Sequence, residues 1–207
     1  AAGPLMRLRG GLLDLDDTLL DHHGAVGEAL ACWLPTLGVP FTPATRVLWD
    51  DLTETHLQVW RERRITYREQ RRRRLRDFLP ALDLRYAESE LDTIFEGFLR
   101  AYESAWRPFP DVPAAVAAVT AAGLRVAVLT NGTTEQQHRK LRRTGLAGQV
   151  GPVWTVDELG VAKPDPEAFR RACVRWDLPP ATVLSVGDNH ELDVLAARAA
   201  GLQAAYL

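Results

Sequence analysis

The sequence predicts an α/β fold, a doubly wound parallel sheet of five strands with an all-helical domain inserted after the first strand. Three observations predict it. Five short runs are apolar throughout, without polar alternation, which is typical of parallel strands covered on both faces. Helical patterns separate the last four runs, as expected for repeated strand–helix units. Residues 21–108 instead show helical patterns and no convincing strand.

The expected strands and the helices between them follow a regular order. The strands are expected at Leu12–Asp16, Arg125–Thr130, Val153–Val156, Val183–Gly187 and Gln203–Leu207. The intervening helices are expected at Pro113–Ala122, Thr134–Arg143, Pro166–Trp176 and Leu192–Ala200. Asp111 is placed to cap the first of these helices. Pro166 suits the first turn of its helix, where no amide hydrogen is needed.

Residues 21–108 are expected to form at least three helices. Thr42-Pro43 opens one helix, and Thr66-x-x-Glu69 and Ser89-x-x-Asp92 are typical of capping boxes that begin two others. The last helix carries an apolar stripe at helical spacing. We therefore expect a catalytic core from residues 6–20 and 109–207, and a helical cap from residues 21–108.

Composition narrows the class of protein. The 207 residues are 46% hydrophobic, enough for a sizeable core, and the net charge of −2 gives no reason to expect a nucleic acid or a membrane as partner. No apolar run approaches the ~20 residues of a membrane helix. Two distant cysteines predict neither a disulfide framework nor a metal site, and they suit a reducing cytoplasm. No heptad pattern is long enough to predict the oligomeric state.

Two aspartates follow the first expected strand, at the edge where doubly wound sheets bind their ligands. Asp14 and Asp16 are two residues apart, so their side chains point the same way in an extended chain. Paired carboxylates repel each other unless a cation binds or one takes a proton. The first outcome makes a metal site, and the second makes a proton donor.

Two other strand ends carry complementary groups. Asp188 and Asp193 follow the fourth strand, and hard oxygen ligands without cysteine favour Mg²⁺. The second strand ends in Thr130-Asn131-Gly132, a hydroxyl followed by backbone amides in a glycine turn before a helix. That arrangement suits phosphate oxygens.

Lys163 precedes a helix in Lys163-Pro164-Asp165-Pro166. A single ammonium group there can neutralise both a nucleophilic carboxylate and a phosphate. It is one of only two lysines, with Lys140, among 25 basic residues.

In order, these segments resemble the four motifs of the haloacid dehalogenase-like hydrolases. The segments are Asp14-Leu15-Asp16-Asp17-Thr18, the Thr130 turn, Lys163-Pro164-Asp165-Pro166, and Gly187-Asp188 with Asp193. Each motif alone is weak, but four in order are specific. The resemblance runs from Leu12 to the C-terminus and implies a Rossmann-like sheet, with the helical insert where that family carries its cap.

The resemblance implies roles for the residues of the first motif. Asp14 attacks phosphorus and forms an aspartyl-phosphate. Asp16 protonates the leaving oxygen and then activates water, and its backbone carbonyl binds Mg²⁺ beside the carboxylates of Asp14 and Asp188. Thr18 either orients Asp16 or caps a turn.

The resemblance also implies roles for the other motifs. The transferring group is bound by Thr130, the amides of Asn131 and Gly132, and Lys163. Stabilising the charge of that group is the main task in catalysing phosphoryl transfer. Asp193 supports the metal site indirectly or holds Lys163.

Several activities occur in this family, so the fold alone does not decide among them. Its dehalogenases usually lack the second aspartate, because a halide leaves without a proton, and this chain has Asp16. Its phosphonate hydrolases need a cap lysine, and residues 21–108 contain none. We therefore expect a phosphomonoesterase for a small phosphorylated metabolite, such as a nucleotide or sugar phosphate. A sugar phosphomutase and a catalytically idle binding protein remain alternatives.

The expected cap contains nine arginines between Arg61 and Arg76. On a helix from Tyr67, Arg71 falls within the apolar stripe and Arg68 lies near it. An arginine among apolar residues needs an anionic partner. A structural ion pair is the favoured interpretation, and recognition of an anionic substrate group by Arg71 or Arg68 is the alternative.

Overall fold

A computed structural model describes residues 7–207 and contains a five-stranded parallel sheet. The strands are β1 (Gly10–Leu13), β2 (Arg125–Leu129), β3 (Val153–Trp154), β4 (Val183–Gly187) and β5 (Gln203–Tyr206). Their order is β3-β2-β1-β4-β5, and every neighbouring pair is parallel. The predicted doubly wound α/β class is confirmed.

The centre of the sheet is a topological switch point. From β1 the chain continues outward through β2 and β3, then crosses to the other side for β4 and β5. Leu13 at the end of β1 pairs with Val128 of β2 and Val186 of β4. Such a point is where doubly wound folds bind ligands, because the loops leave the neighbouring strand ends in opposite directions.

The first strand is shorter than predicted and begins earlier in the sequence. It covers Gly10–Leu13 instead of Leu12–Asp16. Gly10 permits the early start, because a Cβ there would lie 2.7 Å from a ring atom of Trp176. The chain leaves the sheet after Leu13 and turns at Asp17, which has a φ of 62°.

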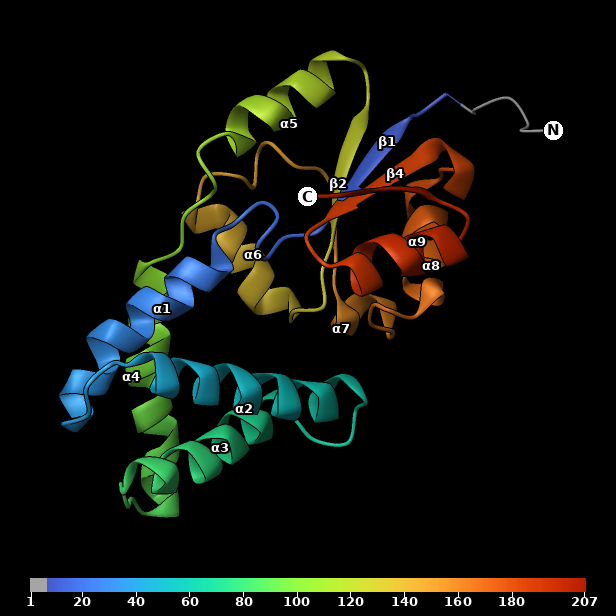
Figure 1. Ribbon diagram of the computed structural model, residues 1–207. Helices are drawn as coiled ribbons and strands as arrows, with labels where there is room; N and C mark the ends of the chain where they lie inside the picture. The colour runs from blue at the N-terminus through green and yellow to red at the C-terminus, as the bar shows by residue number, and fades with distance from the viewer. Residues whose placement is uncertain (1–6) are drawn as a thin grey trace. The chain divides into compact units, whose positions relative to one another are not determined.

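Helices cover both faces of the sheet (Figure 1). They are α5 (Val112–Ala121) and α6 (Thr134–Arg143) on one face, and α8 (Pro166–Trp176) and α9 (Ala196–Ala199) on the other. Val126 and Val128 of β2 pack with the first pair, whereas Ala127 and Leu129 pack with the second. This double cover explains why the strand sequences are apolar throughout.

Two predicted features at helix starts are wrong. The last helix begins before Leu192, with the π-helical turn η5 (His190–Leu195), because the Asn189 side chain accepts hydrogen bonds from the amides of Glu191 and Leu192. The side chain of Asp111 makes no cap hydrogen bond to α5. Thr155 caps α7 (Val156–Leu159), a short helix that was not predicted.

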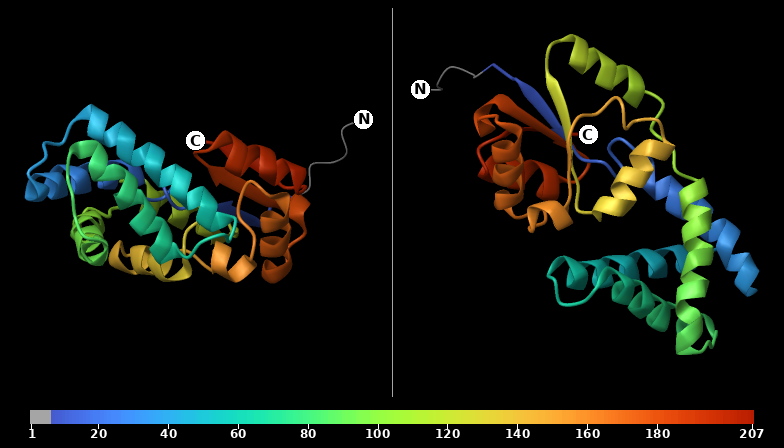
Figure 2. Two further views of the ribbon diagram at one scale, coloured as in Figure 1. Left: turned by 90° about the horizontal axis from the view of Figure 1, so that it is seen from below. Right: turned by 180° about the vertical axis from the view of Figure 1, so that it is seen from behind.

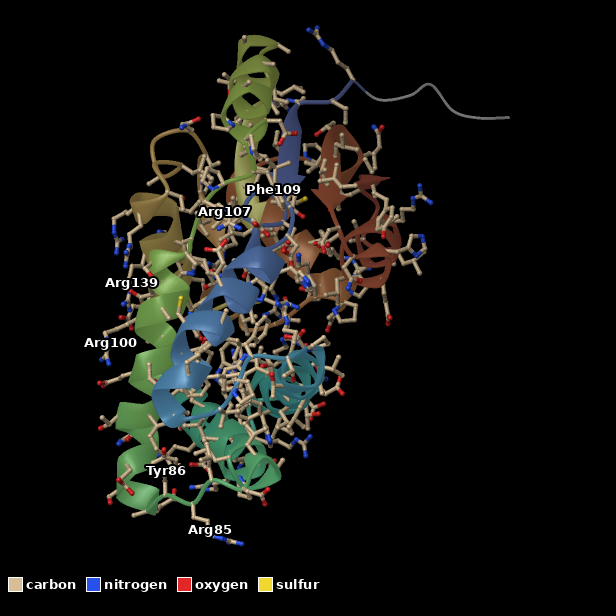
Figure 3. The ribbon with its side chains drawn as sticks, turned by 60° about the vertical axis from the view of Figure 1, so that its left-hand side comes forward. Arg85, Tyr86, Arg100, Arg107, Phe109 and Arg139 are labelled. Atoms are coloured by element: carbon tan, nitrogen blue, oxygen red, sulfur yellow. The ribbon has the colours of Figure 1, made fainter. Side chains whose placement is uncertain are left out.

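The chain divides into two compact units, the part up to His22 with Trp106–Leu207, and His23–Ala105. The first unit contains the two segments that lead to and from the second. These segments run side by side: the Asp21 amide donates to the Arg107 carbonyl, and the guanidinium of Arg107, which is labelled in Figure 3, lies 2.6 Å from the Asp21 carboxylate. Residue 6, where the core is expected to begin, lies outside the described residues.

The second unit is helical throughout. It contains α2 (Pro43–Arg61), α3 (Tyr67–Phe78), α4 (Leu91–Ser104), most of α1 (His22–Trp33), and the short turns η1 (Leu34–Leu37), η2 (Pro80–Leu82) and η3 (Glu88–Glu90). Figure 2 shows α2 and α3 side by side. Trp49 is at the centre of their core, with ring centroids 4.9 Å from Phe78 and 4.4 Å from Phe98. The helix α1 was not predicted.

Helix caps in this unit follow the sequence only partly. Thr66 accepts a hydrogen bond from the Glu69 amide at 3.1 Å, as predicted. The box predicted at Ser89 is wrong, because the Glu90 carboxylate caps the Ala87 amide at 2.7 Å and Asp92 binds arginines instead. No helix in residues 7–207 is both long and apolar enough to span a bilayer.

Candidate active site

The carboxyl ends of β1 and β4 bring a buried lysine against two aspartates. Asp14 follows β1 directly, and its amide donates to the Val186 carbonyl at 2.9 Å. Lys163 is only 3% exposed, and its Nζ lies 2.6 Å from Asp14 Oδ1. The same Nζ also donates to Asp193 Oδ1. The first, third and fourth motifs therefore meet at one ammonium group.

Asp193 is placed to hold this lysine. It is 2% exposed, and its second carboxylate oxygen accepts a hydrogen bond from the Asn189 amide at 3.2 Å. A Cβ on Gly187 would lie 2.3 Å from the Asp193 carboxylate, so only glycine leaves room for it. Asp193 was expected either to support the metal site indirectly or to hold Lys163. The structure shows its contact with Lys163.

The turn after β2 is tied to the lysine loop by a reciprocal pair of hydrogen bonds. The Asn131 side chain donates to the Lys163 carbonyl at 2.7 Å and accepts from the Lys163 amide at 2.8 Å. The peptide bond between Lys163 and Pro164 is cis. Sequence reasoning assigned Asn131 only a backbone role, and it did not foresee this side-chain link.

Thr130 and Gly132 form the predicted turn. Thr130 is 3% exposed, and its hydroxyl accepts a hydrogen bond from the Gly132 amide at 3.3 Å. A Cβ on Gly132 would lie 2.0 Å from Gln137 Nε2, so a larger residue here would displace the Gln137 side chain.

Asp16 has two partners that were not predicted, both on α6. Lys140 Nζ lies 2.5 Å from Asp16 Oδ1, and Gln137 Nε2 lies 3.2 Å from Asp16 Oδ2. Gln137 Nε2 also donates to the Thr130 hydroxyl at 2.8 Å. The one sequence signal for Lys140 was its rarity as a lysine. Gln137 had no signal.

Two roles were left open for Thr18, orienting Asp16 or capping a turn, and the structure places its hydroxyl on Asp188. Its hydroxyl donates to Asp188 Oδ1 at 3.3 Å and accepts from the Asp188 amide at 3.2 Å. The left-handed turn at Asp17 lies between Asp16 and Thr18. Thr18 therefore fixes the acidic loop after β4.

Three carboxylates form a compact acidic cluster. Oxygens of Asp14, Asp188 and Asp193 all lie within 4.8 Å of one another. Burial raises the pKa of Asp14 to about 7, the charges of Asp193 and Asp16 add to the rise, and Lys163 opposes it. Burial, with the charges of Asp17 and Asp193, also raises the pKa of Asp188. A divalent cation would relieve this repulsion, so the donor set fits Mg²⁺.

Asp16 is shifted in the opposite direction. Burial favours a higher pKa, but the charges of Lys140 and His22, with hydrogen bonds from Lys140 and Gln137, outweigh it and lower the pKa to about 2. Two carboxyl groups two residues apart thus have different environments. Such pairs are typical of sites that assign different chemical roles to each carboxyl.

The two arginines singled out on α3 differ in their contacts. Arg68 is exposed, and its Nε lies 3.1 Å from Asp92 Oδ2, which makes the structural ion pair expected for one of them. The Arg71 guanidinium lies over the rings of Tyr67 and Phe95, at 4.6 and 5.1 Å from their centroids. Across residues 7–207, Arg71 forms no ion pair.

Arg74 is the most buried arginine of this helix and was not predicted to be so. It is 5% exposed, and its guanidinium donates to Thr53 and Gln70, both at 2.9 Å, and lies over the Trp49 ring. Burial lowers its pKa to about 10.

The switch point of this doubly wound sheet carries an aspartate pair, a buried lysine and an acidic loop. Together these features define one class of hydrolases. The chain belongs to the haloacid dehalogenase-like hydrolase family, whose model matches residues 9–201.

Curated relatives include enzymes with two kinds of activity. A phosphoserine phosphatase of Thermus thermophilus is 38% identical over 99 residues, which is 48% of this chain and 40% of that enzyme. A phosphoglycolate phosphatase of Salmonella paratyphi A is 30% identical over 95% of this chain and 80% of that enzyme. An (S)-2-haloacid dehalogenase of Pseudomonas sp. is 36% identical over 39% of this chain and 36% of that enzyme. The chain thus spans less than half the length of two of these relatives.

Solved structures share the fold. YfnB from Bacillus subtilis, solved with bound magnesium, has a TM-score of 0.84 with 21% identity, and the match covers 98% of this chain and 89% of that one.

Proposed function

We propose that the protein is a Mg²⁺-dependent phosphomonoesterase that acts on a small phosphorylated metabolite through an aspartyl-phosphate on Asp14. The observation that carries this proposal is the contact between buried Lys163 and Asp14, with Asp16 separately held two residues away. Phosphatases among the relatives support it. The presence of Asp16 favours it over dehalogenation, because an alkoxide leaving group needs a proton and a halide does not.

In the first step, an Asp14 carboxylate oxygen attacks phosphorus and forms a new P–O bond. The bond to the leaving oxygen breaks, and Asp16 donates to that oxygen a proton that its carboxylate must first take up, because its pKa of about 2 leaves it ionised in the free site. The Thr130 hydroxyl and the amides of Asn131 and Gly132 donate hydrogen bonds to the non-bridging oxygens, while Lys163 balances their charge.

In the second step, Asp16 acts as a base. Its carboxylate takes a proton from a water molecule as the water oxygen attacks phosphorus. The P–O bond to Asp14 breaks, inorganic phosphate forms, and the Asp14 carboxylate is restored.

The carboxylates of Asp14 and Asp188 and the backbone carbonyl of Asp16 would hold Mg²⁺. When bound, Mg²⁺ supplies positive charge to the phosphate oxygens. Asp193 contributes by holding Lys163, and Thr18 contributes by fixing Asp188.

We further propose that His23–Ala105 is the expected cap and that the other unit is the catalytic core. Arg71 is the better candidate for a substrate contact, because Arg68 is already paired with Asp92. Both cysteines are free thiols, which supports a cytoplasmic location.

A screen of purified protein against phosphate monoesters, with and without Mg²⁺, tests the proposal. We expect phosphate release that is abolished by a chelator and by Asp14→Asn. Asp177→Asn is the matched control. It removes the same charge from an exposed position at the C-terminal end of α8.

Other outcomes of the screen would favour the alternatives. Transfer of the phosphoryl group between positions of a sugar phosphate, without release, would indicate a phosphomutase. Magnesium binding with no turnover on any ester would indicate a catalytically idle binding protein. Halide release from 2-haloacids in place of phosphate release would indicate a dehalogenase.

A further inference from the structure

Both lysines of this chain lie against the aspartates of the first motif. The other 23 of its 25 basic residues are arginine (25 − 2 = 23). Lys163 contacts Asp14, and Lys140 contacts Asp16. Both lysines are buried, at 3% and 2% exposure. The chain therefore has lysine only where an ammonium group meets a carboxylate of the proposed reaction.

Lys140 and Gln137 each bind one of the two oxygens of the Asp16 carboxyl group. They are three residues apart on α6, so they lie on one face of that helix. Lys140 takes Oδ1 at 2.5 Å, and Gln137 takes Oδ2 at 3.2 Å. With both oxygens held, rotation of the carboxyl group is restricted.

Gln137 also connects Asp16 to the turn proposed to bind phosphate. Its Nε2 donates to the Thr130 hydroxyl at 2.8 Å, and Gln137 is 1% exposed. The absence of a side chain on Gly132 leaves the space that this amide fills. The proton donor and the phosphate-binding turn thus share one hydrogen-bonding partner.

Stability alone is a weak reason for this arrangement. Lys140–Asp16 is a partly buried ion pair. Such a pair gains little over apolar residues of the same size, because desolvation of the charges offsets their attraction. Placement of a reacting group is a stronger reason, since misplacement of such a group by about 1 Å costs about 10²-fold in rate.

We propose that Lys140 and Gln137 are positioning residues that hold the Asp16 carboxyl group at a fixed place beside Thr130 for proton transfer to and from the substrate. This inference rests on the proposed phosphatase function. Neither side chain needs to touch the substrate, because both act through Asp16.

Comparing substrates whose leaving groups differ in pKa tests whether Lys140 and Gln137 position Asp16. An alkyl phosphate releases a poor leaving group that needs the proton of Asp16, whereas p-nitrophenyl phosphate releases a good one that does not. Lys140→Met should therefore lower kcat/KM, which reports the steps up to the aspartyl-phosphate, by about 10²-fold for an alkyl phosphate and much less for p-nitrophenyl phosphate. Lys140→Arg keeps the charge and should recover part of the loss.

Two comparisons separate positioning from a structural effect. In an Asp16→Asn background, Lys140→Met should cause little further loss, because residues that act through one group are not additive. Arg142→Met removes a cation from an exposed position of the same helix and should leave both rates unchanged. Thermal unfolding of each variant checks the fold, and Lys140→Gln serves as the second variant if the Met variant does not fold.

Equal losses in kcat/KM on both esters would overturn the inference, and so would full additivity with Asp16→Asn. Either result leaves the phosphatase proposal intact as long as the wild-type protein releases phosphate. A wild-type protein without turnover would sink the phosphatase proposal, and this inference with it.

Discussion

At the scale of single residues, the site separates two chemically identical side chains by their surroundings. Asp14 lies against Lys163 within an acidic cluster, and Asp16 lies against Lys140 and Gln137 outside it. The pKa of the first rises to about 7 and that of the second falls to about 2. Burial and neighbouring charge, and not residue type, give the two carboxyl groups their different pKa values.

The raised pKa of Asp14 predicts that magnesium binding depends on pH. Between its ordinary value of 3.8 and about 7, the folded protein without metal keeps a proton on Asp14 that the unfolded chain has lost. The unfolding free energy of the metal-free protein therefore receives a declining contribution from this group as pH rises through that window. Mg²⁺ competes with the same proton, so the rise in Tm that Mg²⁺ causes should be larger at about pH 8 than at about pH 5.

Thermal unfolding with and without Mg²⁺ across this pH range measures the effect. Asp188→Asn should reduce the rise in Tm at every pH, and Asp177→Asn should leave it unchanged. A rise in Tm that is independent of pH would contradict the assignment of Asp14 to the metal site.

Gly187 provides a second prediction at this scale. In Gly187→Ala, the added methyl group would meet the Asp193 carboxylate at 2.3 Å and push it away from Lys163. We expect a loss of about 1–3 kcal/mol in stability and a fall in kcat. Gly148→Ala is the matched control, because a Cβ there has no neighbour within 4 Å. Denaturant unfolding and steady-state kinetics make the comparison, and equal stability of the two variants would contradict the packing described here.

At the scale of elements, local sequence determines some boundaries and tertiary contacts determine others. The helices Thr134–Arg143 and Pro166–Trp176 were predicted with their observed bounds. Each has a local start signal, Thr133 as the side-chain cap of the first and Asp165 with Pro166 at the start of the second. The first strand was misplaced because its start depends on Gly10 facing Trp176, which is 166 residues away in the sequence (176 − 10 = 166).

The helix α3 carries a prediction about substrate recognition. Arg71 lies over two aromatic rings with no carboxylate partner in the described chain, so its charge is available to an anionic group. Arg71→Ala should raise KM for substrates with a second anionic group more than for neutral ones, by about 10-fold. Arg73→Ala is the control, because Arg73 is partly exposed and already paired with Glu69. A loss of stability with unchanged kinetics would contradict the prediction.

At the scale of the whole molecule, the sequence predicted the sheet, the helical insert and the four motifs. These follow from hydrophobic period, capping residues and the order of chemically distinctive side chains. Its prediction failed where side chains from separate elements choose partners. Thr18, for which the sequence left two roles open, binds Asp188, and Gln137 links Asp16 to Thr130. No local pattern encodes such contacts, because each depends on how the loops leave the sheet.

The two units differ in what they explain. The unit with the sheet holds every motif residue together, and its contacts account for the proposed phosphoryl-transfer site without reference to the other unit. His23–Ala105 provides an aromatic core around Trp49 and the arginines of α3. We therefore expect the reaction type to depend on the first unit and substrate choice to respond to changes in the second.

The most direct test of the central claim is whether a phosphoryl group becomes attached to Asp14 during turnover. Acid quenching of the reaction, followed by mass spectrometry of the peptide that contains Asp14, measures this attachment. We expect the mass of one phosphoryl group on that peptide in the wild-type protein and none in Asp14→Asn, which should also release no phosphate. Phosphate release by Asp14→Asn at the wild-type rate, with no modified peptide in either protein, would contradict the account.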